Sequence, residues 1–384
     1  MTAKSANKDM LAELIFVFLK LGFTAFGGPA AAVAMMRQEF VLKRQWLSED
    51  EFLDFMGVSN LIPGPNATEL AIYIGYQRIG WLGLILAGVC YFAPAAAIVL
   101  GFARVYTRYG SLPSMVGLLY GIKPVIIAIL LHALWGMLKH RLKRYLGLGI
   151  ATVVFAAYLL GVGPLPLLLG SGVLFVVIKL IKNKPNFPYE ISSLMPLLLT
   201  TSPTLGPAVP FSLLRLFWVF LKAGALMYGS GYVLLAFIQD DLVKNLGWLS
   251  QGQLIDAIAI GQVTPGPLST TVTFVGFITG GLPGALLATI AMFLPGFIFV
   301  FITHPFISKL RRSDISGSFL DGVIFASLGL WAGVTWEIAG AAWVDLFSLA
   351  ISVIGLLLLL VYNLNSSWLI LGGALVGLLR MVFQ

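Results

Sequence analysis

The octapeptide at residues 61–68, Leu-Ile-Pro-Gly-Pro-Asn-Ala-Thr, decides how this chain folds, because a close copy occurs at residues 263–270, Val-Thr-Pro-Gly-Pro-Leu-Ser-Thr. Each copy lies between apolar segments. Proline lacks a backbone donor and clashes with the preceding turn, so a helix does not continue intact through this tripeptide. Because proline starts helices well, the pattern predicts a helix that ends, turns on Gly64 and begins again near Asn66.

The chain is too apolar for a soluble domain. Its 384 residues are 59% hydrophobic and 10% charged, with a mean hydropathy of +0.96, whereas a soluble domain carries roughly 25% charged residues. Several runs approach or exceed the roughly 20 residues that cross a bilayer. They lie at 81–102, 115–138, 282–302 and 346–361. The sequence therefore predicts an all-α polytopic membrane protein with about ten membrane segments, some of them half-helices or re-entrant.

Charge and reactive side chains exclude several classes of function. The net charge is +8, but the basic residues lie in short loops, where they set topology, so we expect a lipid bilayer and no nucleic acid as partner. One cysteine, Cys90, excludes a disulfide scaffold. His132, His140 and His304 share no ligand spacing and are expected at helix ends or in loops. No motif for ATP, zinc or a serine nucleophile occurs, so we predict no enzyme, cofactor or metal site.

The second half of the chain repeats the first at a shift of 202 residues, which becomes 201 after one deletion. The matched pairs include Lys20 with Lys222, Trp46 with Trp248, Asp54 with Asp256, Pro63 with Pro265, Phe92 with Phe293 and Trp135 with Trp336. Chance matches among membrane-type residues do not account for repeated Trp, Lys, Asp and Pro. We therefore divide the chain into a first repeat (1–144), connecting apolar segments and a linker (145–210), and a second repeat with C-terminal segments (211–384).

The basic residues also bear on how the two repeats are oriented. Lysine and arginine in short loops mark the cytoplasmic side. The first half concentrates them at Lys43 and at 139–144, whereas the second half is poor in them there and concentrates its own at 309–312. This exchange of sides predicts an inverted duplication, a design found in transporters. Two features oppose it: Arg104 and Arg108 would fall outside, and 145–210 must supply an odd number of crossings that the sequence does not assign.

Each half carries two helix breakers in equivalent positions. They are Gly27, Gly28 and Pro29; Pro63, Gly64 and Pro65; Gly229, Ser230 and Gly231; and Pro265, Gly266 and Pro267. A helix that restarts inside a protein presents unpaired amides and a partial charge of about +0.5, and such an end binds oxyanions. Polar side chains lie in the first turn of two restarts, at Asn66, Thr68, Ser269 and Thr270. The alternative is that the breakers are packing kinks, since glycine and proline are frequent in membrane helices.

Lys20 and Lys222 are equivalent residues inside apolar segments, each seven positions before its glycine break. A charge at mid-membrane costs about 2.5–3.5 kcal/mol on insertion scales, so it usually faces a cavity or extends to the interface. Two interpretations therefore stand side by side. The lysines line a cavity and offset the charge of a dianion, or each one reaches the headgroup region.

Five carboxylates are candidates for coupling transport to protons: Glu69, Glu39, Asp241, Asp54 and Asp256. Glu69 lies in the first turn after the first Pro-Gly-Pro, where its charge would compete with a bound anion. In the repeat, Glu39 corresponds to Asp241 and Asp54 to Asp256. The alternative is that Glu69 stabilises a helix N-terminus and that the other four are interface charges.

These motifs resemble those of the chromate ion transporter (CHR) family in its fused two-domain form. The likeness rests on Phe-Gly-Gly-Pro at 26–29, Pro-Gly-Pro at 63–65, Gly-Ser-Gly-Tyr at 229–232 and Pro-Gly-Pro at 265–267, and it extends over both repeats. The resemblance implies a bacterial inner-membrane carrier that exports chromate, driven by the membrane potential or the proton gradient, and so confers chromate resistance. It also implies halves of opposite orientation. The second half departs from the first by having Ser-Gly at 230–231 in place of Gly-Pro at 28–29.

The sequence thus predicts a carrier for a tetrahedral oxyanion, with chromate favoured, that binds near the midplane between the halves and works by alternating access. A sulfate or other oxyanion carrier is the main competing hypothesis, since sulfate has the same charge and nearly the same shape. An anion channel and a membrane-embedded enzyme are two further hypotheses. A homodimer is left open.

Overall fold

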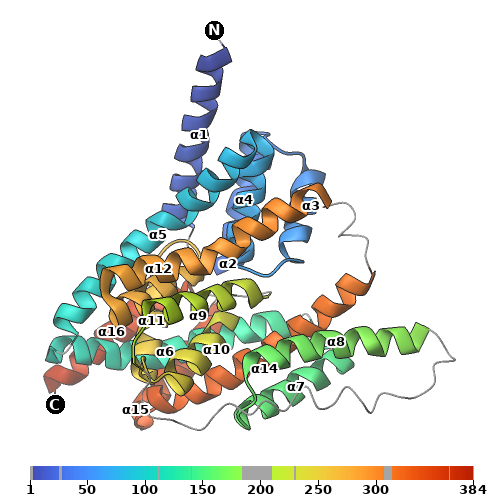
Figure 1. Cartoon of the computed structure of the whole chain (residues 1–384). Coiled ribbons are helices and arrows are strands. Elements are labelled where there is room, and N and C mark those ends of the chain that lie inside the picture. The colour runs from blue at the N-terminus through green and yellow to red at the C-terminus, as the bar shows by residue number, and fades with distance from the viewer. Residues whose placement is uncertain are drawn as a thin grey trace.

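The computed structural model describes residues 3–25, 28–110, 112–139, 141–183, 210–228, 231–306, 314–362 and 364–383. Every regular element in these ranges is a helix (Figure 1). The helices long and apolar enough to cross a membrane are Trp81–Tyr109, Pro113–Leu138, Pro164–Ile181, Leu268–Thr303 and Gly317–Ala342. Shorter apolar helices lie at Tyr145–Leu159, Leu346–Tyr362 and Ser366–Met381. The prediction of an all-α polytopic membrane protein is confirmed, and the number of about ten membrane segments stays a prediction.

The first repeat begins with one helix and a pair of consecutive short helices. One further helix then precedes the first Pro-Gly-Pro and one follows it. Its elements are α1 (Ala3–Thr24), α2 (Gly28–Arg37), the π-helix η1 (Gln38–Lys43), α3 (Glu49–Ser59), α4 (Asn66–Ile79), α5 (Trp81–Tyr109) and α6 (Pro113–Leu138). Two further apolar helices follow, α7 (Tyr145–Leu159) and α8 (Pro164–Asn183). They lie within the connecting region that the sequence places at 145–210, whose division from the first repeat stays a prediction.

The second half presents the same order of elements. They are α9 (Leu213–Leu226), α10 (Val233–Ile238), the π-helix η3 (Gln239–Asn245), α11 (Gln251–Val263), η4 (Leu268–Thr270), α12 (Thr271–Thr303), η5 (His304–Phe306), α14 (Asp314–Ala342), α15 (Leu346–Tyr362) and α16 (Ser366–Phe383). The helix α12 corresponds to α4 and α5 together, because its backbone is kinked at Gly281 (φ 63°) where Gly80 (φ 68°) separates α4 from α5. Only glycine adopts this conformation at little cost, so the repeat preserves both.

The same local chemistry starts the helix before each Pro-Gly-Pro. Ser48 accepts a hydrogen bond from the backbone of Glu51, whose side chain accepts one from the backbone of Ser48. Ser250 and Gln253 form the equivalent capping box at the start of α11. Each cap satisfies two amides that the helix leaves unpaired, which stabilises the helix start by about 1 kcal/mol.

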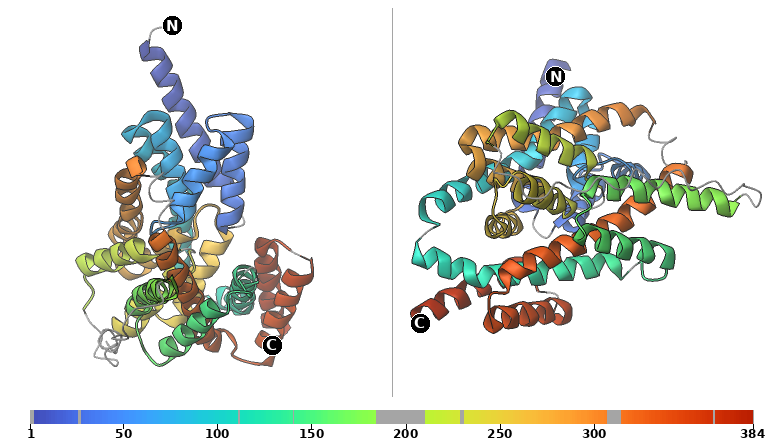
Figure 2. Two further views of the ribbon diagram at one scale, coloured as in Figure 1. Left: turned by 90° about the vertical axis from the view of Figure 1, so that its right-hand side faces the viewer. Right: turned by 60° about the horizontal axis from the view of Figure 1, so that its bottom comes forward.

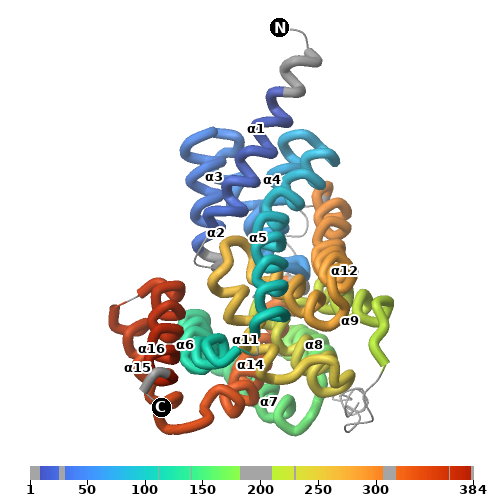
Figure 3. The backbone as a smooth tube through the Cα atoms, turned by 90° about the vertical axis from the view of Figure 1, so that its left-hand side faces the viewer, coloured from blue at the N-terminus to red at the C-terminus, as the bar shows by residue number. Residues whose placement is uncertain are grey.

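The C-terminal helices of the two halves are exchanged. The long helix α6 packs against α15 and α16 of the second half, whereas α14 packs against α7 and α8 (Figures 2 and 3). Gly121 lets α6 approach the backbone of Gly373 on α16, and its equivalent Gly322 lets α14 approach Ser171 on α8. Small residues at such crossings permit the close backbone packing that holds membrane helices together. Neither half is therefore a self-contained bundle.

A pseudo-twofold axis relates the two halves. The equivalent residues Phe92 and Phe293 stack on one another, with ring centroids 4.2 Å apart and planes 3° from parallel. When equivalent residues contact each other, the axis that relates their two units passes between them, as at the interface of a symmetric dimer. The interface of α5 with α12 thus lies at the centre of the duplicated architecture.

Candidate functional site

Both Pro-Gly-Pro sequences interrupt the helices as predicted. The helix α3 ends at Ser59 and α4 begins at Asn66, while α11 ends at Val263 and the short helix η4 begins at Leu268. Gly64 and Gly266 have φ angles of 140° and 92°, which side chains rarely tolerate. The conformation of each turn therefore requires glycine between the two prolines.

Each turn is bonded to the opposite half. The amide of Gly64 donates to the carbonyl of Met227 at 2.6 Å, and the amide of Gly266 donates to the carbonyl of Ala25 at 2.9 Å. Met227 and Ala25 are themselves equivalent and lie just before the glycine breakers of their halves. The reciprocal bonds place each Pro-Gly-Pro turn beside the end of the first helix of the opposite half, but they also commit the amides of both turn glycines to protein acceptors.

The remaining predicted breaker residues are placed unequally. Gly27, Gly229 and Ser230 lie outside the described residues. Gly28 and Pro29 are the first two residues of α2. Gly231 stands two residues before α10 and borders a cavity beside the second Pro-Gly-Pro turn.

This cavity has a volume of about 260 Å³ and is walled by both halves. Its lining comprises Ala25, Ile129, His132, Ala133, Gly136, Gly231, Tyr232, Gly261, Gln262, Thr264, Gly266, Leu268, Asn365, Ser366 and Ser367. The polar groups that line it are hydroxyl, amide and imidazole groups, with no carboxylate among the described residues. A volume of this size exceeds what a few water molecules need. It offers an anion neutral donors without a competing negative charge.

Two contacts fix the polar wall of the cavity. The Tyr232 ring stacks on Trp331, with centroids 4.1 Å apart, and the Gln262 side-chain amide donates to the Tyr232 hydroxyl at 3.0 Å. At the start of α16, which also lines the cavity, Asn365 accepts a hydrogen bond from the Ser367 amide. The amino end of a helix carries a partial positive charge, so α16 adds an electrostatic preference for anions at this wall.

Sequence reasoning missed His132, Tyr232, Gln262 and Asn365 as cavity residues. The expectation that His132 lies at a helix end or in a loop was wrong, because this residue is inside α6 and faces the cavity. His304 does lie at a helix end, after α12, and His140 is outside the described residues. Gln262 and Tyr232 each stand beside a breaker, which is the one sequence signal that could have indicated them.

The first Pro-Gly-Pro turn holds an acid instead. Glu69 is completely buried, and neither of its carboxyl oxygens has a hydrogen-bond partner among the described residues. Oε1 lies against Gly64, so that a methyl group at that glycine would overlap it. The Thr68 hydroxyl and the Asn66 side-chain oxygen are also buried without a partner in the described part of the chain, while the Asn66 amide donates to Asn60.

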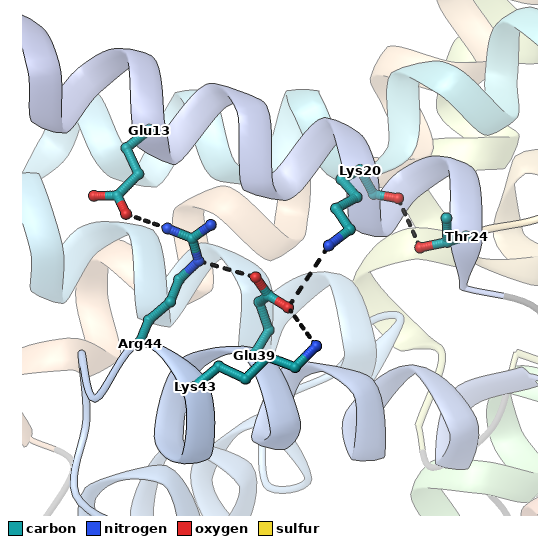
Figure 4. Close-up of polar contacts among 6 residues, drawn as sticks. All are labelled: Glu13, Lys20, Thr24, Glu39, Lys43 and Arg44. Atoms are coloured by element: carbon teal, nitrogen blue, oxygen red, sulfur yellow. Dashed lines mark hydrogen bonds and ion pairs between the residues drawn. The ribbon is translucent and has the colours of Figure 1, made fainter.

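The two predicted lysines contact two of the predicted carboxylates. Lys20 lies 4.0 Å from Glu39, and the equivalent Lys222 lies 2.6 Å from Asp241. Glu39 also binds Arg44 at 2.9 Å, which reaches Glu13 on α1 (Figure 4). Neither lysine lines the cavity. The lysines balance nearby carboxylates in this state, and their role as ligands of a dianion stays a prediction.

The remaining predicted site residues are Asp54 and Asp256, in the helices before the turns, and Ser269 and Thr270, directly after the second turn. Asp256 on α11 accepts a hydrogen bond from Tyr106 at 2.8 Å and lies 3.4 Å from the Lys123 ammonium. Asp54 is half-buried at the equivalent position of α3. Ser269 is buried, and the Thr270 hydroxyl donates to the Pro267 carbonyl. The Thr270 hydroxyl therefore stabilises the turn with its hydrogen bond, and its role toward an anion stays a prediction.

Interrupted helices that meet around a polar cavity between two repeats are a design of membrane carriers, and that is the class which this fold and cavity define. The described residues contain no cluster of side chains suited to a metal ion. The model of the chromate transporter family matches residues 12–176 and 214–378, one match in each half. The chain belongs to the chromate transporter family.

The chain resembles curated chromate transport proteins over most of its length. A probable chromate transport protein of Synechococcus elongatus is 32% identical over 90% of this chain and 89% of the relative. A chromate transport protein of Cupriavidus metallidurans is 30% identical over 96% and 92%, and one of Pseudomonas aeruginosa is 28% identical over 85% and 80%. No solved structure matches the chain.

Proposed function

We propose that this protein exports chromate across the bacterial inner membrane by alternating access and thereby confers chromate resistance. Its membership of the chromate transporter family, with both halves matched, is the observation that carries the proposal. The relatives named as chromate transport proteins align over at least four-fifths of their own lengths, so the comparison covers most of each relative.

In this proposal the cavity beside Gly266 receives the oxyanion. Tyr232, Gln262 and His132 supply side-chain polar groups, and α16 directs its amino end toward the same space. Several convergent donors in a site of low dielectric stabilise an anion without any covalent step. The cavity lies between the halves, where a change in their packing would alter access to it.

Alternating access would use the paired contacts between the halves. The Gly64–Met227 and Gly266–Ala25 hydrogen bonds tie each turn to the opposite half. Rocking of one repeat against the other would break one or both bonds and open the cavity to one side of the membrane. Opposite orientation of the two repeats remains part of the proposal, and so does energy from the proton gradient or the membrane potential.

Transport into everted membrane vesicles tests the function. Vesicles with the protein should accumulate chromate more than vesicles without it, and an uncoupler should reduce the accumulation. Unchanged uptake after collapse of the gradient would contradict a secondary carrier. Sulfate in a parallel assay, and as a competitor, separates chromate export from the competing hypothesis of a carrier for sulfate or another oxyanion. Crosslinking in the membrane tests the homodimer.

Tyr232→Phe tests the cavity itself. The substitution removes the hydroxyl that Gln262 contacts but keeps the ring that stacks on Trp331. We expect a loss of one binding hydrogen bond, about 1 kcal/mol, hence roughly a fivefold higher KM for chromate at unchanged protein level. Tyr145→Phe is the matched control, because Tyr145 is 82% exposed and is not part of the cavity lining. Equal KM values in both variants would remove the cavity from the proposal.

A further inference from the structure

We propose that Glu69 is a proton-binding site at the interface of the two halves. Its carboxylate takes up a proton when the halves close. The inference rests on the proposed transport function and specifies the coupling of that same site. Among the five predicted carboxylates, Glu69 has the environment that such a site needs, and its place in the interface connects the proton to movement of the repeats.

The first observation is that the Glu69 carboxyl group is buried without a hydrogen-bond partner among the described residues. The side chain is 0% exposed, and no described residue donates a hydrogen bond to either oxygen. An ionised carboxylate is not stable in such surroundings, because burial removes water and nothing replaces it. In this state the carboxyl group is therefore protonated.

The second observation is a slot that fits this carboxyl group. Oε1 lies against Gly64 of the first half, and an added methyl group on Gly296 of α12 would stand 3.5 Å from the same oxygen. Two glycines from opposite halves thus leave room for one acid. The slot is an interface feature, because separation of the halves removes one of its walls.

The second half lacks this slot. Gly266, the equivalent of Gly64, faces the methyl group of Ala95, and Ala95 is the equivalent of Gly296. Thr271 stands where the first half has Glu69, and its hydroxyl donates to the Leu268 carbonyl at 2.7 Å. The glycines, the acid and the space between the helices thus occur together at the first Pro-Gly-Pro turn and not at the second.

The third observation concerns the other charges. Glu39 and Asp241 are paired with lysine, and Asp256 lies beside Lys123, so each of these carboxylates has a cation nearby. The titratable groups that face Glu69 are Tyr73 on α4 and Tyr228 after α9. Both are neutral phenols in the physiological range, and no cation in the described part of the chain approaches the acid.

These observations connect the proton to the movement. The Gly64 amide bonds to Met227 of the other half, and Glu69 lies directly beneath that turn. When the halves separate, water reaches the carboxyl group, its O–H bond breaks and the proton passes to water. When they close, the carboxylate takes a proton back. By linkage, the state that binds the proton more tightly is favoured as pH falls, so closure weakens as pH rises.

Hydrogen exchange of the Gly64 amide tests the inference without any transport assay. In the wild-type protein, protection relative to the intrinsic exchange rate should fall by about tenfold for each pH unit across the titration of the acid, the limit for one linked proton. Glu69→Gln keeps the shape and stays neutral, so its protection should not change with pH. The same pH dependence in Glu69→Gln as in wild type overturns the inference.

A second pair of variants keeps the test valid if Glu69→Gln fails to fold. Gly296→Ala narrows the slot and retains the acid, so the pH at which protection is lost should shift, whereas Ala95→Gly at the equivalent position should leave it unchanged. An identical midpoint in Gly296→Ala and wild type overturns the inference. Absence of chromate transport in the wild-type vesicles would instead defeat the proposed function, while the exchange result would still decide whether Glu69 binds the closing proton.

Discussion

The two Pro-Gly-Pro turns have the same sequence motif, the same break in the helix and reciprocal hydrogen bonds to the opposite half, but they enclose different chemistry. At Gly64 the space is filled by the buried acid Glu69, while beside Gly266 lies an open cavity with Tyr232 and Gln262 in its wall. The two copies have kept the same backbone structure around the turn, and a few substitutions have placed different side chains beside it. On this difference rests our proposal that the first turn binds a proton and the second an anion.

The largest expected effect comes from adding a methyl group to each turn. Both glycines have a positive φ that strains alanine, but only Gly64→Ala also displaces a buried acid. We expect Gly64→Ala to lower the stability of the purified protein by about 3 kcal/mol, and Gly266→Ala by about 2 kcal/mol. Thermal unfolding in detergent measures both.

A rescue variant sharpens the same comparison. At Gly266 the nearest obstacle is the Ala95 methyl group, 2.7 Å from the added carbon, so Ala95→Gly should restore about 1 kcal/mol to Gly266→Ala. It should restore nothing to Gly64→Ala. Equal rescue of both variants would show that the two turns are not packed differently.

A smaller difference is expected between the two equivalent lysines. Lys222→Met leaves Asp241 without the ammonium group 2.6 Å away, whereas Lys20→Met leaves Glu39 with Arg44 and Lys43. Because these pairs are partly exposed, we expect about 1–2 kcal/mol for Lys222→Met and less than about 0.5 kcal/mol for Lys20→Met. Chemical denaturation of the two variants decides this, and the reverse order would contradict the ion pairs described above.

The smallest expected difference is between the two capping boxes. Ser48→Ala and Ser250→Ala remove the same cap from equivalent helices, so each should cost about 1 kcal/mol and the two costs should agree within about 0.5 kcal/mol. Unfolding midpoints of the two single variants, measured side by side, provide the comparison. A large difference between the two stability costs would mean that the helix starts have diverged as well as the side chains beside the turns.

The sequence predicted the helix breaks and the repeat well, because both depend on local chemistry. Proline and glycine at 63–65 and 265–267 act on their own backbone, so the breaks follow from the residues alone. The duplication was visible for the same reason. Lys20 and Glu39 were both identified as candidates, but for different roles, because nothing local shows that α1 brings one against the other. Their contact depends on how α1 packs against η1.

The cavity could not be predicted in the same way. His132 comes from α6, Tyr232 from the turn before α10 and Asn365 from the position just before α16, so the set exists only after packing. The exchange of α7 and α8 with α15 and α16 was missed as well. An apolar helix shows that it needs a partner, but its sequence does not say which of several equally apolar helices it will contact.

The exchanged helices have a consequence for biogenesis. The helices α7 and α8 are synthesised long before α14, the helix against which they pack. During translation the first half thus waits in the lipid with its last hairpin undocked, and assembly is completed only after most of the polypeptide has left the ribosome. A gene divided between the halves would yield two products that each carry the missing piece of the other.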